Sequence, residues 1–340
     1  MRAAVYRGPG ELRIEQVPEP ADPGPGEIVI AVRRAAICGT DSSEWAHGPL
    51  LAVPPVILGH EFTGVVAATG PEVSGLAVGD RVVCGSGISC GECEWCRAGR
   101  TNLCARYRTI GLHVDGGLAE YVSAPARICL PVPDAVSDDA AAIAQPLAVA
   151  LHAVRRSGVR AGQSCAVIGV GGIGAFIVAG AVAAGAVPLA ALDVDPERLR
   201  TAERLGATVA LDARGRAIDE VIHEAVGPDG ADVVIEASGV PSAPAAAIAA
   251  AKRGGRVLIV GLQSAPRELD LLAMAVREVE LSTTLAHICD VDLPEALALL
   301  GAGELAAAVT DRVIALEDLV EEGIRPLAAG AVSGKIVVAP

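Results

Sequence analysis

The sequence predicts a two-domain α/β protein in which a β-rich part precedes a doubly wound parallel sheet. The chain has 340 residues, enough for two domains of roughly 150 residues each. Residues 1–145 contain short β-branched runs separated by Gly and Pro, whereas residues 146–284 alternate apolar strands with segments of helical length. Hydrophobic residues make up 52% of the chain, which excludes a disordered protein.

The individual elements follow from this patterning. In the first part, strands are predicted at residues 27–32, 62–67 and 81–84, because Gly and Pro turns bound each run. In the second part, strands at 165–170, 187–193, 231–237 and 256–261 alternate with helices, as in a parallel sheet built from βαβ units. A helix at 293–300 and a strand at 335–338 form a tail too short to be a domain. We therefore expect the tail to pack back onto one of the two domains.

The charge balance argues against nucleic-acid and membrane partners. The chain carries 27 basic and 41 acidic side chains, a net charge of −14, whereas both kinds of partner require clustered Lys and Arg. The N-terminus lacks an apolar run of signal-peptide length, so we expect a cytoplasmic protein with reduced cysteines. Residues 164–192 are uncharged, but six glycines and Pro188 favour a buried strand, turn and helix over a membrane span.

A glycine-rich turn at residues 168–174 predicts a dinucleotide site. The segment Ile-Gly-Val-Gly-Gly-Ile-Gly follows an apolar strand and opens a predicted helix, so its glycines allow a tight turn under a pyrophosphate. Asp193 ends the next strand, where a carboxylate accepts hydrogen bonds from the adenosine ribose. The same carboxylate would repel a 2′-phosphate. We therefore expect NAD as the cofactor and not NADP.

Four cysteines in a Gly-rich loop predict a structural zinc site. Cys90, Cys93, Cys96 and Cys104 have the spacing C-x2-C-x2-C-x7-C, and four thiolates close a tetrahedron around Zn²⁺ without an open position. A disulfide pair and an iron–sulfur cluster are the competing interpretations. Cysteines at four other positions lie in apolar surroundings and are expected to be buried side chains.

A second constellation lies upstream in the motifs Cys38-Gly39-Thr40-Asp41 and Gly59-His60-Glu61. A thiolate, an imidazole and one or two carboxylate oxygens can hold zinc and leave room for water or substrate, as Lewis-acid chemistry on an alcohol requires. A cysteine and a histidine this far apart in a sequence are more often core residues than metal ligands, so these motifs alone do not identify a zinc site.

Taken in order, these motifs resemble those of the zinc-dependent medium-chain alcohol dehydrogenases. The series continues with Asp-Gly-Gly-Leu-Ala-Glu-Tyr at 115–121, Pro-Leu-Ala-Val at 146–149 and the terminal Ser-Gly-Lys-Ile-Val-Val. The likeness covers the whole chain and is greatest to the sorbitol, butanediol and threonine dehydrogenase branch. It implies a GroES-like catalytic domain from residues 1–145 and 285–340, with a structural-zinc lobe at about 84–106. A Rossmann domain at 146–284 would bind NAD.

The resemblance also implies roles for single residues at the reaction centre. Cys38 and His60 correspond to ligands of a catalytic zinc, and Glu61 to a carboxylate beside the metal or exchanging onto it. Thr40 corresponds to the hydroxyl that takes the substrate proton.

Other residues correspond to cofactor contacts in the family. Asp193 and Arg198 match contacts of the adenosine ribose. The remaining cofactor positions are Gly169, Gly171, Gly172, Ile173, Gly174, Val260, Gly261, Leu262 and Thr284. Each chain would bind two zinc ions, one catalytic and one structural.

The chain departs from the family pattern at three places. Gln145 stands where the sorbitol-like branch has a glutamate that binds zinc or polarises its water, and an amide oxygen is a weaker ligand. Ser43 replaces the relay histidine of liver-type enzymes, so proton exit would run through Ser43 and water or through His47. Ala286-His287 replaces an Arg-Tyr pair that contacts polyol hydroxyls, which argues against sorbitol itself. Ser43, Glu44, His47 and His287 are candidates for a polar substrate pocket.

We therefore expect an NAD-dependent dehydrogenase for a secondary alcohol, polyol or vicinal diol, with Cys38, His60 and Glu61 or Gln145 around zinc. One alternative is a redox-neutral, epimerase-like enzyme that retains its NAD. Another is an inactive zinc- and nucleotide-binding homologue, which only Gln145 favours. The strand near residues 280–284 would be an exposed sheet edge in a monomer, so a homodimer or homotetramer is expected.

Overall fold

The computed structural model describes all residues, 1–340, as two compact units. One unit comprises Met1–Ala148 and His287–Pro340, and the other comprises Val149–Ala286. The boundaries predicted from the sequence lie at 145/146 and 284/285. No helix has the combination of length and apolar character needed to cross a bilayer.

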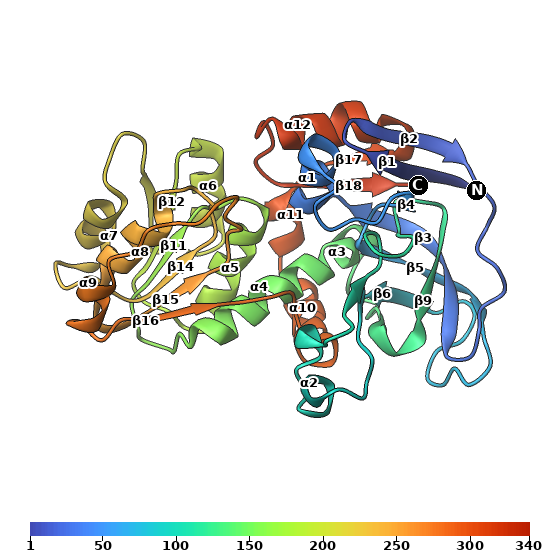
Figure 1. Cartoon of the computed structure of the whole chain (residues 1–340), viewed down its shortest axis with the longest axis horizontal. Coiled ribbons are helices and arrows are strands. Elements are labelled where there is room, and N and C mark those ends of the chain that lie inside the picture. Colours follow the sequence, from blue (N-terminus) through green and yellow to red (C-terminus); the bar gives the residue numbers. More distant parts are fainter. The chain divides into compact units, whose positions relative to one another are not determined.

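The first unit is built on antiparallel strands (Figure 1). A small sheet has the order β2-β1-β4, and a seven-stranded sheet has the order β10-β6-β5-β3-β18-β17, with β9 also paired to β3. The small sheet contains β1 (Arg2–Gly8), β2 (Glu11–Gln16) and β4 (Val56–Ile57). The larger contains β3 (Glu27–Ala36), β5 (Glu61–Thr69), β6 (Arg81–Cys84), β9 (Tyr121–Pro125), β10 (Cys129–Pro131), β17 (Thr310–Ala315) and β18 (Lys335–Ala339). A two-stranded ribbon joins β7 (Gly87–Ile88) to β8 (Arg108–Thr109).

The chain's last strand, β18, completes this larger sheet. It lies antiparallel to β3, with Val337 opposite Ala36, and parallel to β17. The tail predicted from the sequence therefore packs onto the first unit. The unit's helices are α1 (Gly39–His47), α2 (Glu94–Arg97), α3 (Asp138–Ala142), α10 (Cys289–Gly301), α11 (Leu305–Val309) and α12 (Arg325–Ala328), with a π-helical segment at Leu319–Ile324. The helix α4 (Ala144–Ser157) spans the boundary between the units.

The second unit is a six-stranded parallel sheet with the order β13-β12-β11-β14-β15-β16. This is the strand order of a Rossmann domain. Its strands are β11 (Cys165–Ile168), β12 (Leu189–Asp193), β13 (Val209–Asp212), β14 (Ala231–Glu236), β15 (Ala251–Ile259) and β16 (Glu280–Thr283). Its helices are α5 (Gly172–Ala183), α6 (Pro196–Arg204), α7 (Ile218–Val226), α8 (Ala243–Ala250) and α9 (Leu271–Ala275).

Burial explains the apolar runs seen in the sequence. The strands β11 and β12 are buried at every position, because helices cover both faces of a doubly wound sheet. The helices α5 and α6 contact each other, as do α7 and α8. Because parallel crossovers are right-handed and the chain proceeds from β11 first toward β13 and then toward β16, the two pairs lie on opposite faces of the sheet. The α/β fold class predicted from the sequence is thereby confirmed.

Candidate metal and cofactor sites

The glycine-rich turn forms the narrow connection between β11 and α5. Gly169 has a φ of +88°, and a Cβ there would lie 2.7 Å from the backbone of Ser238. A Cβ on Gly174 would lie 1.9 Å from the carbonyl oxygen of Gly169, so only glycine permits this helix to start so close to the strand. Gly171 is the N-cap of α5, and a Cβ there would meet no atom within 4 Å. The turn therefore leaves open space in front of a helix N-terminus, which suits a pyrophosphate.

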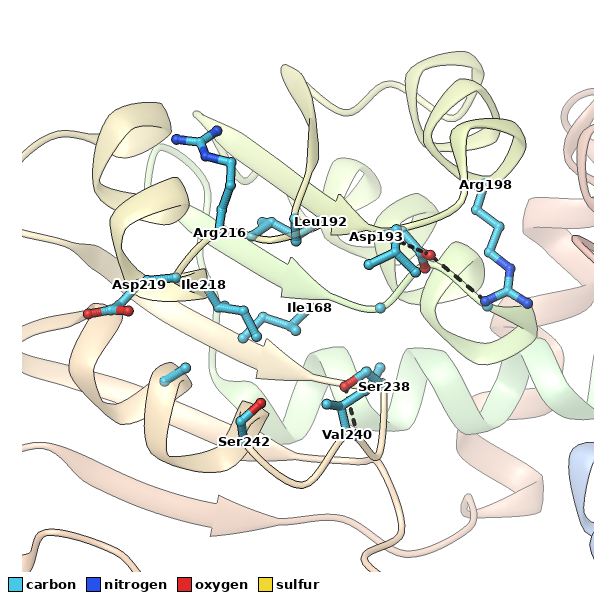
Figure 2. Close-up of a pocket in the computed structure, with 17 residues that line it drawn as sticks. Ile168, Leu192, Asp193, Arg198, Arg216, Ile218, Asp219, Ser238, Val240 and Ser242 are labelled. Atoms are coloured by element: carbon cyan, nitrogen blue, oxygen red, sulfur yellow. Dashed lines mark hydrogen bonds and ion pairs between the residues drawn. The ribbon is translucent and has the colours of Figure 1, made fainter. Parts of the chain in front are cut away.

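Asp193 organises the edge of a pocket beside this turn (Figure 2). One carboxylate oxygen accepts from the backbone N–H of Val170 at 2.7 Å, and the other accepts from Val194 at 2.7 Å and Asp195 at 3.0 Å. The Arg198 guanidinium lies 3.8 Å from the Asp193 carboxylate. A carboxylate and an arginine at this edge fit the recognition of ribose hydroxyls.

The pocket has a volume of about 560 Å³. It is lined by Ile168, Gly169, Gly171, Leu192, Asp193, Val194, Arg198, Ala213, Arg216, Ala217, Ile218, Asp219, Ala237, Ser238, Val240, Ser242 and Ala246. Residues 237–246, which follow β14 at the same sheet edge, also contribute to this pocket and were not predicted from the sequence. Val260, Gly261, Leu262 and Thr284 are not in this lining, and their roles remain predictions.

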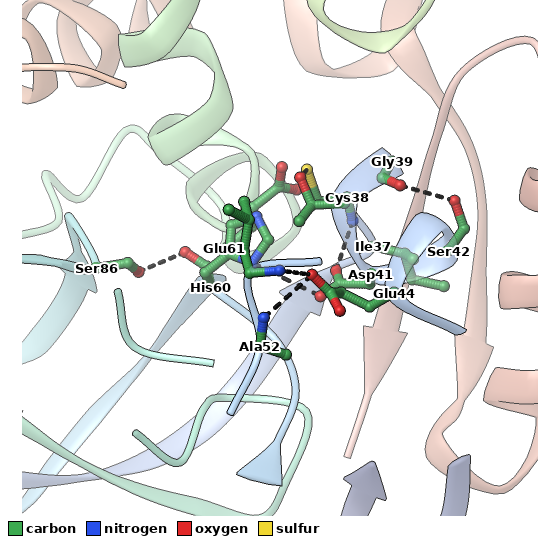
Figure 3. A network of polar contacts seen from close by, with 12 residues as sticks. Ile37, Cys38, Gly39, Asp41, Ser42, Glu44, Ala52, His60, Glu61 and Ser86 are labelled. Atoms are coloured by element: carbon green, nitrogen blue, oxygen red, sulfur yellow. Dashed lines mark hydrogen bonds and ion pairs between the residues drawn. The ribbon is translucent and has the colours of Figure 1, made fainter. Parts of the chain in front are cut away.

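A second group of residues gathers at one end of the larger sheet in the first unit (Figure 3). Ala36 at the end of β3 pairs with Glu61 at the start of β5. This pairing brings Cys38, which follows β3, close to His60 and Glu61. Cys38 is the N-cap of α1. The Cys38 Sγ, a His60 ring nitrogen and a Glu61 carboxylate oxygen all lie within 4.8 Å of one another.

Asp41 connects this group to α1. Its carboxylate accepts from the backbone N–H of Cys38 at 2.9 Å, and its other oxygen lies 3.6 Å from Nδ1 of His60. With Nδ1 facing Asp41, Nε2 is the ring nitrogen left for a metal. The Thr40 hydroxyl lies 3.6 Å from the Cys38 Sγ. No role was predicted for Asp41 from the sequence, although its place three residues after an N-cap could have indicated one.

Lys335 is the unexpected member of the site. It starts β18, is 5% exposed, donates to the carbonyl oxygen of Ile37 at 2.8 Å and forms an ion pair with Glu61. Burial lowers the pKa of this ammonium group, but attraction to Glu61 and Cys38 outweighs burial and raises it. A lysine beside a proposed metal ligand was not anticipated from the sequence.

The electrostatics of the group favour an additional positive charge. Burial lowers the pKa of His60, but attraction to Cys38 and Asp41 outweighs it and raises that pKa to about 10. Burial also raises the pKa of Asp41. His60 Nδ1 is buried without a hydrogen-bond partner. A thiolate, an imidazole and a carboxylate are a normal ligand set for Zn²⁺, so the residues present fit that metal.

The remaining predicted site residues are spread over α1 and α4. Gln145 is buried near the start of α4, Ser43 is half-buried, and His47 is exposed as the last residue of α1. The pocket role expected for Glu44 is wrong. Its buried carboxylate accepts from the backbone N–H groups of Leu50, Leu51 and Ala52, so it holds the following loop. His287 is buried.

The four-cysteine lobe brings its sulfurs together. Cys90, Cys93, Cys96 and Cys104 place their Sγ atoms within 4.8 Å of one another, and all four are free thiols. The backbone N–H of Cys90 donates to the Cys104 Sγ at 3.2 Å, and the N–H of Cys93 donates to the Cys90 Sγ at 3.4 Å. A hydrogen bond from Arg106 lowers the pKa of Cys90 to about 6. Donors aimed at sulfur stabilise thiolates, which are the form that binds zinc.

Comparison with known proteins yields two family matches. Residues 24–134 match the alcohol dehydrogenase GroES-like domain, and residues 172–302 match the zinc-binding dehydrogenase family. The first match falls within the first unit, which contains Cys38, His60 and Glu61. The second includes most of the parallel sheet.

Individual proteins show the same relationship over longer stretches. The chain is 37% identical to a sorbitol dehydrogenase from Bacillus subtilis (strain 168), covering 78% of this chain and 76% of that protein. It is 33% identical to an L-threonine 3-dehydrogenase from Burkholderia cenocepacia (strain HI2424), covering 99% and 98%. A solved zinc-binding dehydrogenase from Sinorhizobium meliloti 1021, bound to NADP, is 35% identical with a TM-score of 0.92, covering 100% and 99%.

Proposed function

The chain belongs to the zinc-dependent medium-chain dehydrogenase family and is an NAD-linked dehydrogenase acting on CH–OH groups, and from that premise we propose that it oxidises a secondary alcohol or polyol at a zinc site formed by Cys38, His60 and Glu61. The observation that carries the proposal is the convergence of these three donors within 4.8 Å, at the end of one β-sheet. Bound zinc supplies a Lewis acid for the substrate hydroxyl, and bound NAD supplies the hydride acceptor.

The protein's own residues prepare this site. Cys38 and His60 would hold the metal, and Asp41 faces Nδ1 of the imidazole at 3.6 Å, which leaves Nε2 for the metal. The ammonium group of Lys335 balances the charge of Glu61. This carboxylate therefore keeps a positively charged partner even when it does not bind the metal. Gln145 would provide a neutral oxygen as the fourth ligand, which binds more weakly than a carboxylate but leaves the metal a stronger Lewis acid.

Thr40 would take the substrate proton at its hydroxyl oxygen. Its position two residues after Cys38 puts this hydroxyl beside the sulfur ligand. From there the proton would leave through Ser43 and water, or through His47, whose exposure at the end of α1 gives it access to solvent.

Asp193 supports NAD as the cofactor in preference to NADP. Its carboxylate lies in the pocket lining, and repulsion of a 2′-phosphate would disfavour NADP. The similarity to a structure solved with NADP makes this preference worth testing directly.

The substrate class follows from the relatives. Sorbitol and threonine each carry a secondary hydroxyl next to another polar group, and vicinal diols share that feature. Ala286 and His287 stand in place of the Arg-Tyr pair expected for sorbitol, so we propose a different polyol or diol. The test is a panel of acyclic and cyclic polyols and diols assayed for NADH formation. At least one diol should yield NADH in a zinc-dependent way, and no turnover by fully zinc-loaded protein would contradict the proposal.

The second zinc would be structural. Cys90, Cys93, Cys96 and Cys104 offer four sulfurs, which leaves no open coordination position for chemistry. Removal of this zinc should therefore loosen the lobe rather than abolish a catalytic step.

A homodimer or homotetramer is proposed for the assembly. The strand β16 is at the edge of the parallel sheet, and Leu281 on it is 37% exposed. The nearby segment exposes Leu271, Leu272 and Val276. An unpaired edge strand with exposed apolar neighbours is what a second copy would cover. Cytoplasmic location stays a prediction.

A further inference from the structure

Glu236 is a fully buried carboxylate in the nucleotide-binding unit. It is the last residue of β14 and has no exposed surface. One of its carboxylate oxygens, Oε1, accepts from the backbone N–H of Ser238 at 2.7 Å, the Ser238 hydroxyl at 2.6 Å and the N–H of Gly239 at 2.9 Å. The side chain therefore holds the loop that leaves β14.

The same residue contacts the loop after β15. Its backbone carbonyl accepts from the N–H of Val260 at 2.8 Å and of Gly261 at 3.0 Å. A Cβ on Gly261 would lie 2.6 Å from the second carboxylate oxygen, Oε2, so Gly261 packs directly against it. Glu236 thus joins the loops that follow two neighbouring strands.

These loops border the cofactor pocket. Ala237, Ser238 and Val240 line it, and Figure 2 shows Ser238 and Val240 close together at its edge. Ser238 also packs on Gly169, where a Cβ would come within 2.7 Å of it. A displacement of Ser238 would therefore change both the pocket wall and the space around the pyrophosphate turn.

The burial of this charge calls for an explanation. Oε2 is buried without a hydrogen-bond partner, and no lysine, arginine or histidine forms an ion pair with Glu236. A buried carboxylate with an unpartnered oxygen is unfavourable for folding. In return, Oε1 makes three charge-assisted hydrogen bonds, which are stronger than those an amide would make.

We infer that Glu236 is a positioning residue of the cofactor site: its carboxylate fixes Ser238 and Gly239, and with them the pocket wall that receives NAD. It acts through the loop and does not touch the cofactor. The inference rests on the NAD role proposed above. It adds Glu236, at the carboxyl edge of the sheet, to the glycine turn and Asp193 as parts of the cofactor site.

Asp232, at the opposite end of the same strand, provides a matched control. It accepts from the Ser164 N–H at 2.9 Å and hydroxyl at 2.7 Å and forms an ion pair with Lys252. Asp232 is not in the pocket lining. Replacing it also removes a hydrogen-bonded carboxylate from β14, but at the edge away from the cofactor.

The test compares Glu236→Gln, Glu236→Ala and Asp232→Asn in the full-length protein, with NAD⁺ affinity measured by calorimetry and stability by thermal unfolding. Glu236→Gln keeps the shape but weakens the three hydrogen bonds, so the Kd for NAD⁺ should rise about 3- to 10-fold. Glu236→Ala should raise it further. Asp232→Asn should lower the melting temperature while changing the Kd less than about twofold. Zinc content and the KM for the alcohol should stay at parental values in Glu236→Gln.

A Kd for Glu236→Gln within about twofold of the parent would overturn the inference, even if Glu236→Ala does not fold. Equal losses of affinity in Glu236→Gln and Asp232→Asn would also overturn it, because the effect would then be general loosening of the strand. Failure of the unmodified protein to bind NAD⁺ would instead contradict the proposed function.

Discussion

Replacement of Lys335 by methionine tests whether the end of the chain stabilises the proposed metal site. Methionine keeps much of the side chain's length and apolar stem but removes the charge. Glu61, 1% exposed, would then lie in the core without its ammonium partner, and the Ile37 carbonyl would lose its donor. We expect this variant to be the least stable of the charge substitutions around the site.

The magnitude follows from the burial of the pair. Removing one partner of a buried ion pair costs about 3–5 kcal/mol, because the remaining charge is left uncompensated. The side chains of Lys335 and Glu61 are 6% and 1% exposed, so little solvent screening reduces that figure. In a unit of roughly 200 residues this corresponds to a fall in melting temperature of about 6–20 °C.

The assay is thermal unfolding monitored by calorimetry after mild chelation, so that no metal ion competes with Lys335 for Glu61. The control is the double variant Glu61→Gln/Lys335→Met, which removes both charges and should recover at least half of the lost stability. A single variant that melts within about 2 °C of the parent would refute the reasoning. So would a double variant that is less stable than the single one.

Four further predictions address the cofactor, the metal, the loop and the assembly. The kcat/KM with NAD⁺ should exceed the kcat/KM with NADP⁺ by a wide margin, and Asp193→Ser should reduce this difference. Equal kcat/KM values with the two cofactors in the unmodified protein would refute the assignment. Mild chelation should remove about one zinc per chain and abolish activity. Gln145→Glu should raise metal retention and move the pH optimum of alcohol oxidation upward. Unchanged metal retention and an unchanged pH profile in this variant would exclude Gln145 from the metal's ligands. Glu44→Ala leaves three backbone N–H groups without an acceptor, so it should destabilise the protein by about 2–4 kcal/mol in denaturant titration, whereas an effect under about 0.5 kcal/mol would contradict the hydrogen bonds described. Light scattering at micromolar protein concentration should give the mass of a dimer or tetramer. A single species of 34.2 kDa, the mass of one chain, would rule out this assembly.

The sequence was sufficient for those features whose physics is local. The glycine turn could be predicted because its requirements, a positive φ at Gly169 and close packing at Gly174, depend on residues only a few positions apart. The four-cysteine lobe is similar, since its ligands lie within one short loop. The parallel sheet was predictable because its buried strands consist of continuous apolar runs.

Features that depend on distant parts of the chain were harder to predict. Lys335 reaches Ile37 across 298 positions, and only the pairing of β18 with β3 brings them together. Glu44 was misassigned because a glutamate on a helix beside a predicted site suggests a pocket residue. Its actual partners are backbone N–H groups of the next loop, which sequence patterns do not reveal. Glu236 looked like the end of an apolar strand, and its role depends on the loops after β14 and β15.

Zinc stoichiometry measured together with NADH formation tests the central claim most directly. Unmodified protein should contain two zinc ions per chain and form NADH from a diol identified in the substrate panel. Cys38→Ser should contain one and form no NADH, while its melting temperature stays within a few degrees of the parent's because the structural lobe keeps its metal. A Cys38→Ser protein that keeps two zinc ions, or that still oxidises the diol at the parental rate, would contradict a catalytic zinc at this site.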